Sequence, residues 1–282
     1  MRIASPTFRA LVMLIALPGG LLASRSVSAT VIAEDGFAYT TGDLNGENGG
    51  SGDWKDSWTG DSELDVTLGG WGYTDSLGNE LLVSGEHIEL DSDPGGYKKA
   101  ERSMNDKVGV ISETVWFSAI LDGTASSEIH HISLSDGVSF GQGYKDQGAT
   151  TWMLGDQDGL IQDTGLSSNA RAFLVVRIDF TGGDEDVWLW VDPLLDSAPS
   201  TASADASGVA KSFEADKIFA HLESYGDAGF DEVRLGTSFV DVVPIGSVPD
   251  PDTLTLLGAG LVLLAAVSRE RRGPRLRASG SA

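Results

Sequence analysis

The chain of 282 residues contains no cysteine. This absence excludes a disulfide framework, a thioether-linked lipid anchor, thiolate metal ligands and cysteine nucleophiles. A domain that lacks disulfides has to be stabilised by its hydrophobic core.

Basic residues are scarce, since 19 Lys and Arg stand against 42 Asp and Glu, a formal net charge of −23. Most of the arginines lie at the two ends of the chain, so the body between them is more acidic than the whole. Such a body repels phosphate backbones and anionic lipid surfaces. The composition therefore argues against nucleic-acid binding.

Long apolar stretches are absent except at the two ends. Near the amino terminus, Arg2 and Arg9 accompany the apolar stretch ALVMLIALPGGLLA, and the small residues SVSA follow. This order is typical of a secretory signal. We predict a signal peptide over residues 1–29, cleaved before Thr30, and therefore an exported protein. An uncleaved anchor is the alternative, which the shortness of the apolar stretch disfavours.

The second apolar stretch covers residues 254–267 and is followed at once by SRERR. At about 1.5 Å per residue a helix here spans roughly 21 Å, less than a hydrocarbon core of about 30 Å, so a buried core helix is one interpretation. Thr253 and Ser268 can extend the segment, and the arginines can reach a cytoplasmic surface. We predict a transmembrane helix over 254–268, a basic cytoplasmic tail over 269–282, and the acidic body outside.

A Pro-Asp-Pro turn precedes this helix in the linker over residues 245–253. The expected signal consists of Val248, Pro249, Asp250, Pro251, Arg269, Arg271 and Arg272. The order of turn, apolar helix and basic residues resembles the carboxy-terminal sorting signal of bacterial PEP-CTERM proteins, with Asp250 where that family usually has Glu. The resemblance implies transient anchoring, processing by an exosortase-type enzyme, and release to the cell surface or extracellular matrix.

The body over residues 30–244 shows the alternation of β-strands. In VGVISETVWFSAIL one parity is mostly apolar, whereas Ser112, Thr114 and Ser118 fall on the other parity together with Trp116. The apolar parity comprises Ile111, Val115, Phe117, Ala119 and Leu121. AFLVVRIDF and DVWLWVDP predict a hairpin, and KIFAHLES with GFDEVRLGTS predicts a similar late pair. TGDLNGENGGSGD predicts a loop, and DSAPSTASADASG a flexible one.

These patterns predict one all-β domain, a sandwich of two antiparallel sheets. Three blocks of the body, EDGFAYTTGDLNGENGGSGDWKDSWTG, AFLVVRIDFTGGDEDVWLWVDP and GFDEVRLGTSFVDVVP, resemble in their order the concanavalin A-like, laminin-G-type jelly-roll domains. These occur in exported proteins of planctomycetes and related bacteria. The resemblance implies that the first strand, near residues 31–37, pairs close to the last, near residues 230–237. It implies little about chemistry, because that fold carries many functions.

EHIELDSD is the one candidate catalytic group. Glucanases of this fold carry two or three carboxylates on one strand, and Glu89, Asp91 and Asp93 share a strand face. The last position is Asp where the pattern has Glu, and PGG follows as a turn signal. We therefore expect no catalytic residues, and a protein that is not an enzyme.

Oxygen ligands suited to Ca²⁺ occur in DLNGEN and DQDG. The candidates are Asp43, Asn45, Glu47, Asp156 and Asp158. Neither group follows the twelve-residue calcium loop, so solvated turn carboxylates are the main interpretation. No cofactor is expected to be required, and calcium stays open. His130 and His131 are adjacent, so they point to opposite faces of a strand and do not chelate one ion together.

Trp188 and Trp190 share one strand face, where they serve either the core or a sugar-stacking platform. Lys98, Lys99, Arg102 and Lys107 form the only basic cluster of the body, either a solvated loop or a contact for an acidic polysaccharide. The expected function is an exported structural or adhesive module of the cell surface or matrix. The alternatives are a calcium-assisted carbohydrate-binding lectin and, more remotely, a glycoside hydrolase.

Overall fold

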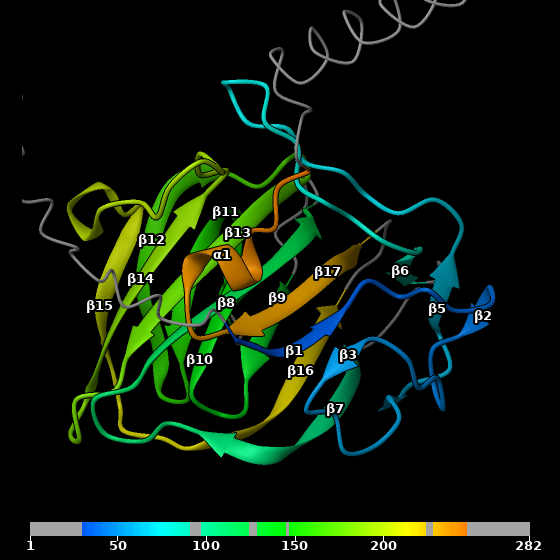
Figure 1. Cartoon of the computed structure of the whole chain (residues 1–282), viewed down its shortest axis with the longest axis horizontal. Coiled ribbons are helices and arrows are strands. Elements are labelled where there is room, and N and C mark those ends of the chain that lie inside the picture. The colour runs from blue at the N-terminus through cyan, green and yellow to red at the C-terminus, as the bar shows by residue number, and fades with distance from the viewer. Residues whose placement is uncertain (1–29, 91–96, 124–128, 145–146, 224–227, 247–282) are drawn as a thin grey trace, which may run out of the picture.

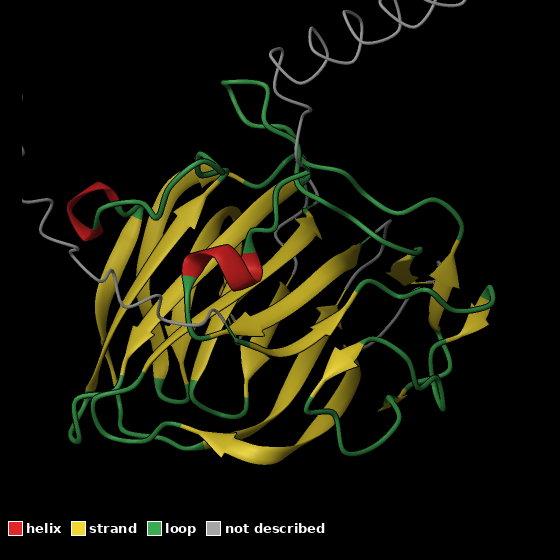
Figure 2. Cartoon of the chain, viewed as in Figure 1, coloured by secondary structure: helices red, strands yellow, loops and turns green. Residues whose placement is uncertain are grey.

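The computed structural model describes residues 30–90, 97–123, 129–144, 147–223 and 228–246. Within these ranges the chain forms two β-sheets stacked face to face, in which every strand pairing is antiparallel. Figure 2 shows that strands make up nearly all of the regular structure, with short helical turns outside the sheets. The prediction of an all-β, two-sheet antiparallel sandwich is confirmed.

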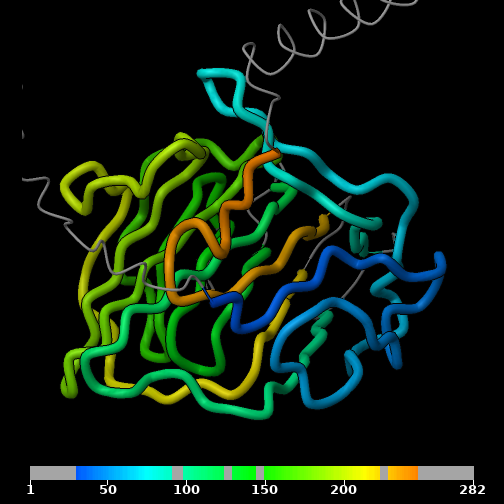
Figure 3. Tube along the Cα trace, viewed as in Figure 1, coloured from blue at the N-terminus to red at the C-terminus, as the bar shows by residue number. Residues whose placement is uncertain are grey.

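The first sheet has ten strands in the described part of the chain, eight of them in one continuous order. That order is β15 (Ala206–Ala210), β14 (Glu185–Val191), β13 (Ala172–Asp179), β8 (Thr114–Asp122), β17 (Gly229–Gly236), β6 (His87–Leu90), β5 (Leu64–Thr67) and β2 (Gly42–Asp43). The strand β1 (Val31–Asp35) also pairs with β17, and β3 (Ser51–Gly52) pairs with β1. Figure 3 shows the first described strand beside the last segments of the chain, as expected for these ends of the sequence.

The second sheet has seven strands among the described residues. Its order is β12 (Gly159–Ser167), β11 (Gln147–Asp156), β10 (Val138–Tyr144), β9 (Ile129–Leu134), β16 (Ala215–Glu223), β7 (Tyr97–Val108) and β4 (Thr59–Gly60). Figure 1 shows this sheet behind the ten-stranded one, with the helix α1 (Phe239–Val242) in front of both.

The core lies between the sheets and follows from strand alternation. On β8, Val115, Phe117, Ala119 and Leu121 point inward and are fully or almost fully buried. Each buried side chain of the larger kind contributes about 1.5–3 kcal/mol of hydrophobic stabilisation. Ile111 had been assigned to the same strand face, but it precedes β8 and its side chain is 67% exposed. The prediction for that residue is wrong, because the chain turns before the strand begins.

A second apolar cluster covers the outer face of the ten-stranded sheet. It comprises Trp71, Leu81, Trp116, Ile120, Phe173, Val175, Trp190, Leu195, Phe239, Val242 and Val243. Strands β8, β13 and β14 supply one side of it, and α1 with loops from residues 68–86 and 192–205 supply the other. This cluster, called the aromatic cover below, makes that face a second core.

The late pair of strands is not a hairpin. KIFAHLES belongs to β16 in the seven-stranded sheet, and GFDEVRLGTS belongs to β17 in the ten-stranded sheet. That prediction is wrong, because each strand hydrogen-bonds to partners distant in the sequence.

The segment 196–208 is ordered by long-range contacts, which contradicts the expected flexible loop. The 3-10 helix η1 (Thr201–Ser203) lies within it, and β15 begins at Ala206. Just before it, the amide of Leu195 donates to Asp75 Oδ2 at 2.9 Å. The Asp75 carboxylate also accepts from the amides of Leu77 and Asn79, so it fastens two loops together.

A buried ion pair joins β1 to β7 of the second sheet. Arg102 on β7 points into the core, where its Nη1 lies 2.6 Å from Asp35 Oδ2. The same carboxylate accepts from Tyr39 Oη and from Trp58 Nε1 at 2.8 Å. Removing one partner of such a pair leaves an uncompensated buried charge.

The predicted signal peptide, sorting turn, transmembrane helix and basic tail lie outside the described residues. Within the described ranges, no helix has the length and apolarity needed to cross a membrane.

Candidate functional site

The outer face of the seven-stranded sheet carries a mixed polar and aromatic group, here called the histidine face. On β9, Ile132 and Leu134 belong to the core, so His131 and Ser133 point outward. The same alternation and the strand register place partners on neighbouring strands beside them. The histidine face consists of His131, Ser133, Ser139, Met153, Phe219 and His221.

His131 and His221 form the centre of this face. They are directly opposite each other on β9 and β16, and their rings stack with centroids 4.6 Å apart and an interplanar angle of 17°. Burial, together with the neighbouring His221 and His130, lowers the pKa of His131 from its usual 6.5 to about 3. Burial, with Lys99 nearby, lowers the pKa of His221 to about 4. Both imidazoles are therefore neutral at pH 7, with one protonated and one unprotonated ring nitrogen each.

Phe219 extends the stack along β16. Its ring centroid lies 5.9 Å from that of His221, and Lys217 Nζ lies 5.9 Å from the Phe219 centroid. Lys217 also lies 3.3 Å from Glu101 Oε1 on β7. Phe219 is half-buried and belongs to neither apolar cluster. It thus presents an aromatic surface flanked by charged side chains.

Small residues line the middle of the face. Ser133 is opposite Ser139, and His131 is opposite Gly141 on β10. A Cβ at Gly141 would lie 2.0 Å from the His130 carbonyl, and its φ is +153°, so a larger residue does not fit. Ser139 is only 5% exposed, and its buried hydroxyl has no hydrogen-bond partner among the described residues. Buried polar groups of this kind normally have a partner, so this hydroxyl is suited to a ligand.

Neither short helix packs on the histidine face. The helix α1 contacts β17 and β8, and η1 lies beside Trp190 of the other sheet. Neither described helix therefore covers this face, although His131, Ser133 and Ser139 are at most 8% exposed.

Glu89, the described member of the expected carboxylate group, is not brought to the histidine face. Glu89 lies on β6 of the ten-stranded sheet, and its Oε1 lies 2.9 Å from His87 Nε2. The His87 ring stacks on Trp71 with centroids 4.4 Å apart, and its Nδ1 lies 2.9 Å from the Gly69 carbonyl. Asp91 and Asp93 lie outside the described residues.

The first predicted calcium group serves as a loop. The carboxylate of Asp43 accepts from the amide of Asn45 at 2.8 Å, and Asn45 Oδ1 accepts from the amide of Gly60 at 3.3 Å. The carbonyl of Glu47 accepts from the Trp58 amide. These contacts use one Asp43 oxygen, Asn45 Oδ1 and the backbone carbonyl of Glu47 to fold the loop.

The second predicted calcium group is a hairpin turn between β11 and β12. Asp156 accepts from the amides of Asp158 and Gly159 on one oxygen and from the amide of Lys211 on the other. Asp158 pairs with the Lys211 ammonium. In the described ranges, no group of three or more His, Asp or Glu side chains is arranged to hold a metal ion.

Trp188 and Trp190 do share one face of β14, but they differ in surroundings. Trp190 is 3% exposed and stacks on Trp116 at 5.6 Å. Trp188 is half-buried, and the Arg177 guanidinium lies 5.4 Å from its ring centroid. Trp190 thus belongs to the aromatic cover, whereas part of the Trp188 ring stays exposed to solvent.

The basic cluster seen in the sequence is dispersed in space. Lys98 pairs with Glu63 at 2.6 Å, and Lys107 pairs with Glu214 at 3.0 Å. Arg102 is buried in the core, and Lys99 is opposite His221. Only Lys99 therefore adjoins the histidine face.

Sequence reasoning placed His130 and His131 on opposite faces, which is correct, but it missed His221 as the partner. His130 is fully buried on the core side. The alternation in KIFAHLES puts Phe219 and His221 on one parity, which was the available signal. The pairing of β16 with β9 supplies the rest.

No family model matches the chain, and no curated protein does. Solved structures with some likeness include a carbohydrate esterase of the Shiga toxin-encoding bacteriophage phi24B, 12% identical, with a TM-score of 0.38 and coverage of 74% of this chain and 99% of that one. A second is the catalytic domain of a GH131 β-glucanase from Podospora anserina, 12% identical, with a TM-score of 0.34 and coverage of 71% and 95%.

This comparison corrects one expectation. Both neighbours are described as enzymes, which contradicts the prediction that this chain is not an enzyme, and we withdraw that prediction. At these TM-scores the likeness assigns no activity to the chain.

Proposed function

We propose that the chain is an exported protein whose β-sandwich binds a polysaccharide on the histidine face. The observation that carries the proposal is the buried, unpartnered Ser139 hydroxyl beside two stacked neutral imidazoles, on a sheet face that neither described helix covers. Ordinary solvent-facing strand residues are rarely so buried.

The side chains of this face match the chemistry of a sugar chain. Sugar hydroxyls both donate and accept hydrogen bonds, as do neutral imidazoles and serine hydroxyls. The apolar face of a pyranose ring suits the half-buried ring of Phe219. Because these groups come from three adjacent strands, β16, β9 and β10, they suit a chain of sugars that lies across the strands.

The charge of the protein favours a neutral polysaccharide. The chain carries −23 overall, and of the two lysines beside the face, Lys217 is paired with Glu101, while Lys99 is opposite His221. An anionic polymer would meet a repulsive field, whereas a neutral one would not.

Export and sorting complete the proposal. The sequence of residues 1–29 supports secretion, and the turn at Pro249 to Pro251 with the predicted helix over 254–268 supports a PEP-CTERM-like sorting signal. An exosortase-type enzyme is then the processing partner, and the cell surface or extracellular matrix is the destination. The pairing of β1 with β17 supports a concanavalin A-like jelly roll as the class of sandwich.

The test measures binding of the full chain to a panel of neutral and anionic polysaccharides, with calcium and with a chelator. Phe219→Ala is expected to weaken binding of the neutral polysaccharide by about tenfold or more, since aromatic stacking is lost. Phe213→Ala is the matched control, because Phe213 is also half-buried but lies on a loop against Phe180. Equal binding by Phe219→Ala and the unchanged chain would contradict the proposal, as would a preference for anionic polymers.

A further inference from the structure

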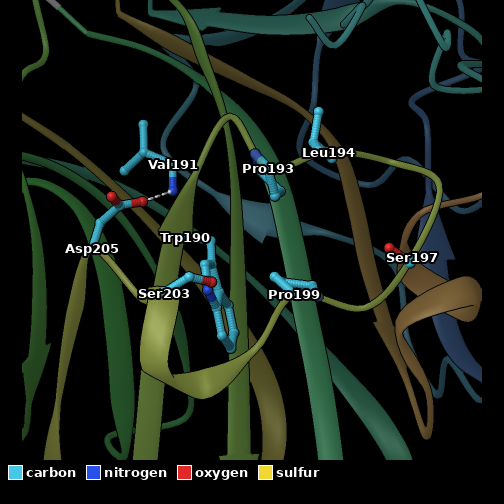
Figure 4. A pocket seen from close by; sticks show the side chains of 8 residues that line it. All are labelled: Trp190, Val191, Pro193, Leu194, Ser197, Pro199, Ser203 and Asp205. Atoms are coloured by element: carbon cyan, nitrogen blue, oxygen red, sulfur yellow. Dashed lines mark hydrogen bonds between the residues drawn. The ribbon is translucent and has the colours of Figure 1, made fainter. Parts of the chain in front are cut away.

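A pocket under the loop 193–205 lies on the ten-stranded sheet, on the opposite side of the molecule from the histidine face. Its volume is about 300 Å³, at the lower end of the range of small-molecule sites. Figure 4 shows the indole of Trp190 lying between Ser203 and Pro199, with Pro193 and Leu194 above. The pocket therefore has an aromatic floor and largely apolar walls.

The Trp190 indole brings an unused donor to this pocket. Trp190 is 3% exposed, and its Nε1–H is buried without a hydrogen-bond partner among the described residues. Its ring stacks on Trp116, at 5.6 Å and 22°, which uses a ring face and not the N–H edge. A buried indole N–H usually finds a partner, so an acceptor supplied by a ligand would satisfy it.

The pocket is held in shape before any ligand binds. Asp205 Oδ2 accepts from the Val191 amide at 2.8 Å, and Tyr73 Oη donates to the Pro193 carbonyl at 3.0 Å. The Leu195 amide donates to Asp75. A site fixed in this way does not have to be ordered on binding.

The polar groups around the pocket select the ligand. Among the described residues that line it none is basic, and Asp205 contributes a carboxylate, so an anion is disfavoured. An ammonium group has only donors, so it could not accept a hydrogen bond from the Trp190 N–H. A plain hydroxyl would leave the apolar walls of Pro193, Leu194 and Pro199 unused. The pocket therefore calls for an acceptor for the Trp190 N–H, a donor for the Asp205 carboxylate and an apolar group for its walls. An acetamido group has all three, because it carries a carbonyl, an N–H and a methyl.

We propose that this pocket binds the acetamido group of an N-acetylated sugar. The acetamido carbonyl accepts from Trp190 Nε1, the acetamido N–H donates to the Asp205 carboxylate, and the methyl packs against the two prolines. This site is independent of the histidine face, since it rests on other residues of the other sheet.

The experiment titrates the full chain with N-acetylglucosamine, glucose and acetate, and follows the indole N–H resonances of the seven tryptophans. The Trp190 resonance, identified with Trp190→Phe, is expected to shift with N-acetylglucosamine alone. Trp190→Phe keeps an aromatic ring but lacks the donor, so binding should weaken about tenfold. Trp188→Phe is the matched control on the same strand face and should bind as the unchanged chain does.

Asp205→Asn provides a second variant for the binding measurement if Trp190→Phe does not fold. Its amide oxygen can still accept from Val191, but its NH₂ then opposes the ligand N–H, so binding should weaken severalfold. Phe219→Ala should leave N-acetylglucosamine binding unchanged, which separates this site from the histidine face. The proposal is overturned if glucose or acetate shifts the Trp190 resonance equally, if no saturable binding occurs, or if Trp188→Phe loses as much affinity as Trp190→Phe.

Discussion

The two sheets of the sandwich differ in what their outer faces carry. On the ten-stranded sheet, outward side chains such as Trp116 and Phe173 are apolar and at most 5% exposed. On the seven-stranded sheet, the outward side chains at the centre are histidines and serines. Strand alternation alone produces both faces, so the difference lies in the residue type at each outward position.

This difference decides whether the outer face of each sheet has to be covered by other parts of the chain. Apolar outward residues need a cover, and the loops over residues 68–86 and 192–205 with α1 supply one. Those loops are fastened by side chains such as Asp75 rather than by regular structure. The polar face carries few apolar residues that require such a cover. Its central His131, Ser133 and Ser139 are nevertheless at most 8% exposed, and the half-buried Phe219 is the side chain that keeps an exposed part for a ligand.

The largest expected effect concerns the covered face. Trp116→Ala should lower the free energy of unfolding by about 3–5 kcal/mol, because it removes a buried ring from between Trp190 and Phe239. Chemical denaturation of the full chain measures it. Trp188→Ala on the same face should cost much less, since Trp188 is half-buried. Similar losses for the two variants would show that the aromatic cover does not stabilise the fold.

The cover also shows where sequence reasoning stopped. The pattern around β8 placed Trp116 on the polar parity, and nothing local indicates that this parity is buried. What buries it lies far away in the sequence, in residues 68–86, 192–205 and α1. The stretch DSAPSTASADASG was predicted to be flexible from composition, yet the amide of Leu195 just before it is held by Asp75, 120 positions earlier.

Strand positions, by contrast, were well predicted from local alternation. The hairpin of β13 and β14 and the inward set on β8 follow from period-two patterns. Which strands pair does not follow from the same patterns, because β16 and β17 follow each other in the sequence but join different sheets. The His131–His221 stack depends on that pairing, so the candidate site could be only half predicted.

An effect of intermediate size is expected in the pH dependence of stability, through the two histidines of the polar face. The lowered pKa values of His131 and His221, about 3 and about 4, mean that the unfolded chain takes up protons below its pKa of about 6.5 while the folded chain does not. The stability they contribute is present above pH 6.5 and is lost as the pH falls toward 4. Replacing both histidines with Gln should reduce the loss of stability between about pH 6.5 and 4.5 by about 2 kcal/mol or more.

Urea unfolding across this pH range measures the loss. The groups near the two rings are Lys99, Asp136 and Glu101 for His221, and His130 and His221 for His131. Phe219→Ala is the control, because it changes the same face without removing a titrating group. If the double variant loses as much unfolding free energy between pH 6.5 and 4.5 as the unchanged chain does, the imidazoles would have to be solvated in the folded chain.

The smallest expected effect on stability comes from Phe219 itself. Its ring is half-buried and belongs to neither apolar cluster, so Phe219→Ala should cost no more than about 1 kcal/mol of unfolding free energy. Phe117→Ala is the contrasting variant, because Phe117 is fully buried and packs edge to face on Phe140 at 5.0 Å; it should cost about 3–5 kcal/mol. If Phe219→Ala were as costly as Phe117→Ala, the Phe219 side chain would have to be buried under other parts of the chain, and the histidine face would be a second covered face instead of a binding surface. A small loss of stability together with a large loss of polysaccharide binding is the combination that only an open, ligand-binding face produces.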